Sequence, residues 1–135
     1  MKLENVVFVR VAQVEKIHEE ALASGGAAGI LDLNLLVSAV LAPSTTFDGR
    51  PLYGSLAEMA ATYAWSIARN HAFVDGNKRT ALMTALTFLE LNGRKLQVGP
   101  EWVDVMVRVA SDEGFPRSAL AGEFVRAMGT DVPID

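Results

Sequence analysis

The residues most suited to chemistry lie in one short run, positions 71 to 80, which reads His-Ala-Phe-Val-Asp-Gly-Asn-Lys-Arg-Thr. Histidine is the side chain that most readily takes up a proton near neutral pH, so His71 is a candidate general base. Asp75 offers a hard oxygen ligand for Mg²⁺, which proteins usually bind through one or two carboxylates together with substrate phosphates. Lys78 and Arg79 add positive charge, and an arginine can hold two phosphate oxygens at once. This pattern indicates a site that transfers part of a nucleotide to a hydroxyl.

A helix is expected to begin at the two cations, because apolar residues follow at helical spacing, at Leu82, Ala85, Leu86 and Leu89. The first N–H groups of a helix are free, and the macrodipole is positive there. A helix start preceded by Gly76 and Asn77 is therefore a natural phosphate cradle. Lys78 is unfavourable at a helix N-terminus on dipole grounds, and this local conflict favours an anionic ligand.

Every candidate residue also has a purely structural interpretation. A single histidine at a helix end, such as His71, is more often a cap or a packing residue, and its neighbours are what favour catalysis. Asp75 and Asn77 could simply cap the helix that follows. Phe73 is apolar between polar neighbours and is expected to anchor the loop to the core. His18 lies on an apolar helical stripe without a partner pattern, so it is interpreted as a hydrogen-bonded core histidine.

The composition is that of a globular protein without cysteine chemistry. The chain has 135 residues, of which 50% are hydrophobic and 21% charged, which suits one domain spanning residues 1–135. With no cysteine and two histidines, neither a disulfide nor a structural zinc site is expected. A net charge of −4 and a pI of about 5.1 argue against direct binding to nucleic acid. No signal pattern or membrane-length apolar run is found, so a cytoplasmic location and no membrane contact are expected.

The periodicity of the apolar residues predicts a mostly α-helical chain. Apolar stripes and caps mark helices from Val11 to Leu22, from Asp32 to before Pro43, from Ser55 to before His71, from Lys78 to Asn92, from Pro100 to Ala110, and from Pro116 to Met128. Residues 43 to 54, which contain the pair Asp48-Gly49, are expected to form a loop or small hairpin. The tail from Gly129 to Asp135 is expected to fray.

The run from His71 to Arg79 resembles the Fic/Doc signature HxFx(D/E)(G/A)N(G/K)R. It lies closest to the death-on-curing (Doc) branch, in which a lysine precedes the arginine. The segment Gly29-Ile30-Leu31-Asp32, with the Leu-Leu and Ser-Ala pairs after it, and the segment Leu89-Glu90-Leu91-Asn92-Gly93 also resemble the family. The resemblance covers roughly residues 5 to 128. It implies a compact Fic-type helical bundle with a small β-hairpin flap at Thr45 to Tyr53.

Three positions depart from the adenylyl-transferring Fic proteins, which typically read HPFx(D/E)GNGRxxR. Ala72 replaces their proline, Lys78 replaces their second glycine, and Leu82 stands where they carry a second arginine. Doc toxins are similar in these respects, and the resemblance implies inverted nucleotide binding that presents the γ-phosphate of ATP to the acceptor. The implied activity is phosphorylation of a Ser/Thr hydroxyl on a protein. Elongation factor Tu is the family's known target, and translation arrest would follow.

The resemblance also implies a role for each residue of the motif. His71 would take the proton from the acceptor hydroxyl, and Asp75 would hold Mg²⁺. The phosphates of ATP would be bound by Gly76, Asn77, Lys78 and Arg79. Phosphoryl transfer depends on positioning and charge stabilisation more than on covalent chemistry, and this set of residues supplies both.

The sequence also bears on how the protein is inhibited and on which other functions it could have. Some Fic proteins inhibit themselves through an (S/T)xxxE(G/N) helix, for which this sequence has no match, so a separate Phd-like antitoxin is the expected inhibitor. Two alternatives stay open: an adenylyl (nucleotidyl) transferase acting on a protein hydroxyl, and a catalytically inactive binding module. A ribonuclease toxin using His71 and Lys78 is disfavoured by the acidic pI.

Overall fold

The computed structural model describes residues 1–111 and 114–135, and it is mostly α-helical with one small hairpin, as the sequence predicted. The helices in the described residues are α1 (Val11–Ala21), α2 (Leu33–Leu41), α3 (Leu56–Asn70), α4 (Asn77–Leu91), α5 (Glu101–Ser111) and α6 (Arg117–Met128). Short 3₁₀ turns occupy Leu3–Asn5 and Ala42–Ser44, and the strands are β1 (Thr46–Phe47) and β2 (Arg50–Pro51). Within this part of the chain, no helix combines the length and the apolar character needed to cross a membrane.

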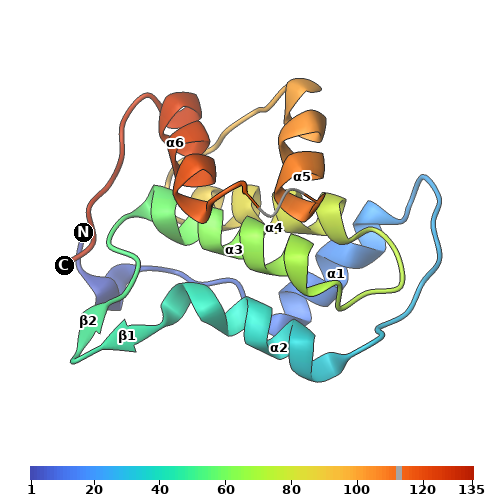
Figure 1. Ribbon diagram of the computed structural model, residues 1–135. Coiled ribbons are helices and arrows are strands. Elements are labelled where there is room, and N and C mark those ends of the chain that lie inside the picture. The colour runs from blue at the N-terminus through green and yellow to red at the C-terminus, as the bar shows by residue number, and fades with distance from the viewer. Residues whose placement is uncertain (112–113) are drawn as a thin grey trace.

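Helix α3 is the centre of the fold, and it packs against α2, α4, α5 and α6 (Figure 1). One face of α3 carries alanines that are fully buried, at positions 57, 61, 64 and 68. Small side chains allow neighbouring helix backbones to approach closely, so these alanines explain how α3 accommodates partners on several sides. The same helix runs to His71, so this packing fixes where the candidate site begins.

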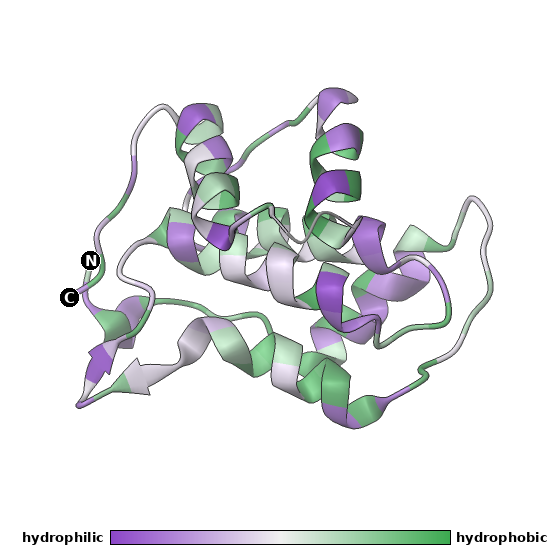
Figure 2. Cartoon of the chain, in the orientation of Figure 1, coloured by the Kyte–Doolittle hydropathy of each residue, from purple (hydrophilic) through white to green (hydrophobic). Residues whose placement is uncertain are grey.

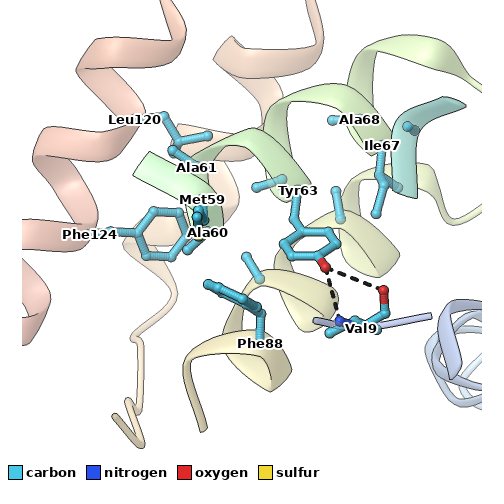
Figure 3. Close-up of a cluster of buried hydrophobic side chains, with 14 of the residues drawn as sticks. Val9, Met59, Ala60, Ala61, Tyr63, Ile67, Ala68, Phe88, Leu120 and Phe124 are labelled. Atoms are coloured by element: carbon cyan, nitrogen blue, oxygen red, sulfur yellow. Dashed lines mark hydrogen bonds between the residues drawn. The ribbon is translucent and has the colours of Figure 1, made fainter. Parts of the chain in front are cut away.

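The largest buried side chains fill the space between α3 and its neighbours, as Figure 3 shows for Tyr63, Phe88 and Phe124. The Tyr63 hydroxyl accepts a hydrogen bond from the Val9 N–H at 2.9 Å and donates to the Val9 carbonyl at 3.3 Å. Burial raises the pKa of Tyr63, so the phenol stays protonated and keeps its donor. This bond ties the extended segment before α1 to the core.

The predicted helix starts are largely confirmed. Asp32 caps α2, because its Oδ1 accepts the Leu35 N–H at 3.1 Å. Ser55 caps α3 by accepting the Glu58 N–H at 3.2 Å, whereas the Glu58 carboxylate reaches back to the Gly54 N–H at 2.7 Å. In a standard capping box the Glu58 carboxylate would accept the N–H of the cap residue, Ser55, whereas here it accepts the N–H of the residue before it.

The predicted hairpin is also confirmed. Strands β1 and β2 pair antiparallel, and the two residues between them, Asp48 and Gly49, both have positive φ values of 53° and 75°. A two-residue turn with positive φ at both positions matches the right-handed twist of the flanking strands, which is why Asp-Gly is favoured there. The Phe47 side chain stands 78% exposed on this hairpin.

The expectation that the tail frays is wrong. The Ile134 side chain is buried, and its N–H donates to the Gly54 carbonyl at 2.8 Å. The Asp135 N–H donates to the Met1 carbonyl at 2.9 Å, so the two ends of the described chain lie side by side (Figure 1). These partners are distant in sequence, so the local composition of the tail did not reveal them.

The tail also completes the N-terminus of α3. The Leu56 N–H donates to the Val132 carbonyl at 2.9 Å, and the Ala57 N–H donates to Asp131 Oδ1 at 3.1 Å. Together with the Ser55 cap, these bonds satisfy the first three N–H groups of the central helix, which have no acceptor within the helix itself.

Replacing Asp131 with alanine is therefore expected to lower the free energy of unfolding by about 0.5–2 kcal/mol, the usual cost of a lost helix cap. Urea denaturation would measure it. Asp135→Ala is the matched control, because that exposed aspartate lies in the same segment and its side chain makes no hydrogen bond within the described residues. Equal stability of the two variants would show that Asp131 does not act as a cap.

Candidate active site

The predicted site residues surround one cavity of about 580 Å³. It lies where the loop after α1 and the loop between α3 and α4 meet the first turns of α4 and α5. The structure brings all six predicted site residues to its wall: His71, Asp75, Gly76, Asn77, Lys78 and Arg79. The cavity also has apolar lining residues, which are Leu22, Val74, Leu82, Trp102, Val103 and Met106.

His71 ends α3 in an unusual backbone conformation. Its φ and ψ are 49° and 46°, the left-handed region, and its side chain is exposed on the cavity wall. A residue other than glycine in this region is strained, and such strain often marks functional positions. The turn ends the helix and directs the following residues across the site. Periodicity located the end of α3 but not this conformation.

The motif loop is fixed to the segment before α2. The Ala72 carbonyl accepts the Leu31 N–H at 2.7 Å, and the Val74 N–H donates to the Gly29 carbonyl at 3.0 Å. Phe73 lies between them and is only 1% exposed, which confirms that it anchors the loop to the core. The loop is thus held on both sides of Phe73 by residues more than 40 positions earlier in the sequence.

The Asp75 carboxylate is oriented by two backbone donors. Its Oδ1 accepts the Gly76 N–H at 2.9 Å, and its Oδ2 accepts the Ala27 N–H at 3.3 Å. Each oxygen keeps a further lone pair, and the side chain is exposed on the cavity wall. Within the described residues, no three His, Cys, Asp or Glu side chains gather into a metal cage. The residues fit Mg²⁺ held by one carboxylate together with nucleotide phosphates.

The start of α4 presents free backbone donors to the cavity. Gly76 takes the left-handed conformation, with φ 78°, just before the helix, which begins at Asn77, one residue before the predicted start. In the part of the chain that the structure describes, the N–H groups of Asn77, Lys78 and Arg79 have no acceptor. Unpaired N–H groups at the positive end of a helix dipole favour a bound anion.

The Asn77 side chain itself has a structural task. Its Oδ1 accepts the Phe73 N–H at 3.1 Å, and its Nδ2 donates to the Phe73 carbonyl at 2.9 Å. The amide therefore closes the loop over residues 73 to 77 and fixes the first turn of α4. What Asn77 presents to a ligand is its backbone N–H and the second hydrogen of Nδ2.

Comparison of this sequence with known proteins shows the family to which the site belongs. The family model described as "Fic/DOC family" matches residues 8–89. The chain belongs to the Fic/DOC family. It is 47% identical over 76 residues to "Toxin Doc" of Mycolicibacterium smegmatis, which covers 56% of this chain and 58% of that protein. It is 48% identical over 58 residues to "Protein kinase doc" of Escherichia phage P1, covering 43% and 46%. The aligned part spans about half the length of these curated relatives.

Both cations of the Fic/DOC motif lie at the cavity without a carboxylate partner. Neither Lys78 nor Arg79 forms an ion pair with any of the described residues. The Arg79 guanidinium donates from Nη1 to the Ala21 carbonyl at 2.6 Å and to Ser24 Oγ at 3.2 Å. This anchors the guanidinium at the C-terminal end of α1, where the helix dipole favours a cation. Its Nε and Nη2 donors remain for a ligand.

His18 was correctly predicted to be a packing residue, but its contact with the motif was missed. It is 6% exposed, and its ring stacks on Phe73 with centroids 3.8 Å apart and planes 9° apart. Its Nε2 lies 2.8 Å from the Asp75 carbonyl oxygen. The contribution of Ser24 and Ala27 was also missed, because these residues follow the predicted end of the first helix at Leu22 and belong to no recognisable motif.

Proposed function

We propose that this chain is a Doc-type toxin that transfers the γ-phosphate of ATP to a Ser/Thr hydroxyl of a protein target, with elongation factor Tu as the expected target. The observation that carries the proposal is the shared cavity. A histidine suited to proton transfer lines the same space as three N–H groups and two cations that have, respectively, no acceptor and no carboxylate partner among the described residues. The names of the two relatives, a toxin and a protein kinase, support the same function.

In the proposed reaction, His71 accepts the proton of the acceptor hydroxyl as its oxygen bonds to the γ-phosphorus and the bond to the leaving ADP breaks. The N–H groups of Asn77 to Arg79 hold the phosphate oxygens, and the side chains of Lys78 and Arg79 offset their charge. Mg²⁺, held through Asp75, would neutralise further phosphate charge. The apolar wall formed by α5 offers a surface on which the nucleoside can lie.

Two residues on the cavity wall favour transfer of the γ-phosphoryl group over transfer of a nucleotide. The Lys78 side chain adds bulk and charge where adenylyl transferases have glycine. Leu82 is apolar and lines the cavity where those enzymes carry a second arginine. The β- and γ-phosphates would therefore lack the clamp that they have in adenylyl transferases.

The expected result with purified elongation factor Tu, Mg²⁺ and ATP is a mass gain of one phosphoryl group, read by intact mass spectrometry. Label on the γ-phosphate should stay with the target, and label on the α-phosphate should not. Lys78→Gly should lose this activity without becoming an efficient adenylyl transferase, because Leu82 still replaces the second arginine. A gain of a whole nucleotide monophosphate would instead identify the unmutated chain as an adenylyl transferase. No gain under any condition would favour a binding module.

Exposed apolar side chains on α2 suit a protein partner. On α2, most of whose residues Figure 2 colours as hydrophobic, Leu33, Leu35 and Leu41 are 55%, 40% and 57% exposed. Contiguous exposed apolar surface commonly marks a protein contact. This supports inhibition by the amphipathic tail of a Phd-like antitoxin, and the exposed hairpin supports alignment of a target segment by edge pairing.

A further inference from the structure

One buried side chain in contact with the motif has no part in the proposed chemistry. His18 lies on α1, and its Nε2 approaches the Asp75 carbonyl oxygen at 2.8 Å. A carbonyl oxygen only accepts hydrogen bonds, so His18 must carry the proton on Nε2 and donate it. The Asp75 carbonyl has no other partner among the described residues.

This hydrogen bond fixes the orientation of the peptide group between Asp75 and Gly76. In a trans peptide the C=O and the N–H point in opposite directions. Because the carbonyl is held towards α1, the Gly76 N–H is directed the other way, to Oδ1 of Asp75 at 2.9 Å, and Asp75 is one of the residues that line the cavity. One bond from His18 thus orients both the last peptide before α4 and the carboxylate expected to hold Mg²⁺.

The opposite orientation of this peptide would damage an anion site. Glycine accepts both signs of φ, so the Asp75–Gly76 peptide has little intrinsic preference to oppose a flip. A flipped peptide would direct the partial negative charge of the carbonyl oxygen into the cradle at the start of α4. It would also remove the donor that holds the Asp75 carboxylate.

The surroundings of His18 make the bond hard to replace. Its ring is 6% exposed and lies flat on Phe73, itself 1% exposed. One turn further along α1, Leu22 lies so near the loop that a Cβ atom added at Gly76 would come within 3.1 Å of it. The Asp75 carbonyl therefore faces α1 through a partly buried hydrogen bond, and losing the His18 donor would leave this acceptor without its partner in the protein.

We propose that His18 is a positioning residue that holds the Asp75–Gly76 peptide in the orientation the phosphate cradle requires. The inference rests on the proposed function, because it assigns His18 to the same nucleotide site. His18 touches neither substrate nor Mg²⁺ in this account. It acts through the backbone of Asp75.

Two variants separate the hydrogen bond from the packing. His18→Phe keeps an aromatic ring against Phe73 and removes the donor, whereas His18→Gln keeps an N–H donor and removes the ring. Tyr63→Phe is the matched control, because it also retains a buried ring while losing a hydrogen bond to backbone, at Val9. Inorganic tripolyphosphate and a non-hydrolysable ATP analogue, each with Mg²⁺, would be titrated by calorimetry at a temperature where thermal unfolding shows every variant folded.

The expected result is that His18→Phe binds both ligands about tenfold or more weakly, the effect of one partly buried acceptor left without its hydrogen bond. His18→Gln should recover most of that loss. Tyr63→Phe should unfold at a lower temperature but bind like the unmutated protein. A purely structural role for His18 would lower the unfolding temperature of His18→Phe in the same way and leave affinity unchanged.

Failure of the inference can be told apart from failure of the proposed function. If the unmutated protein binds neither ligand, the nucleotide site itself is wrong. If it binds both, and folded His18→Phe binds them equally well, the peptide-orienting role of His18 is excluded. Loss of affinity in both His18 variants would show that a hydrogen-bond donor at this position is not sufficient and would also overturn the proposal.

Discussion

The proposed phosphoryl transfer to elongation factor Tu is expected to fall by about 10²–10⁴-fold when His71 is replaced by asparagine, the usual contribution of a general base. Asparagine is the most informative substitution because His71 lies in the left-handed region, with φ 49°. Asparagine tolerates this conformation better than other residues with a Cβ, and its amide cannot take up the proton. Since the His71 side chain is exposed, little packing is lost.

The rate loss should occur without loss of nucleotide affinity, because the phosphates are assigned to the start of α4. Calorimetry with a non-hydrolysable ATP analogue would test this, and thermal unfolding would confirm the fold. His71→Ala makes a useful comparison, since alanine in the left-handed region costs about 1–2 kcal/mol of strain and should lower stability more than asparagine does. Transfer at the unmutated rate in both variants would remove His71 from the mechanism.

Features set by neighbouring residues were well predicted from the sequence. The caps at Asp32 and Ser55 bond to N–H groups three residues later, and the Asp48-Gly49 turn requires only its own positive φ values. The motif residues were certain to be close together because they lie within nine positions of one another. Such features follow from local steric and hydrogen-bonding preferences, which a single sequence displays directly.

Features set by residues distant in sequence were missed. His18 bonds to Asp75 across 57 positions, and Asp131 caps the start of α3 across 74. Neither His18 nor Asp131 belongs to a recognisable local pattern, because their partners are backbone groups, which carry no residue identity. Backbone acceptors and donors are present at nearly every position, so only the folded arrangement shows which ones remain to be satisfied.

The role of Arg79 depends both on its local motif and on contacts with residues distant in sequence. Its substitution is expected to have a large effect on nucleotide binding. Its place in the motif predicted a phosphate contact, and the structure adds an anchor, since Nη1 donates to the Ala21 carbonyl and to Ser24 Oγ. A guanidinium can hold α1 with one nitrogen and offer its other edge, Nε and Nη2, to phosphate. The anchor therefore orients the free edge before any ligand arrives.

Arg79→Ala should weaken binding of a non-hydrolysable ATP analogue by about 10–100-fold, the effect of losing hydrogen bonds to a charged group. Arg79→Lys should recover only part, because a single ammonium cannot hold α1 and grip two phosphate oxygens in fixed geometry. Arg94→Ala is the matched control, an exposed arginine outside the cavity. Ser24→Ala should give a smaller loss, since Arg79 keeps its bond to Ala21. Unchanged affinity in both Arg79 variants would place the phosphates elsewhere.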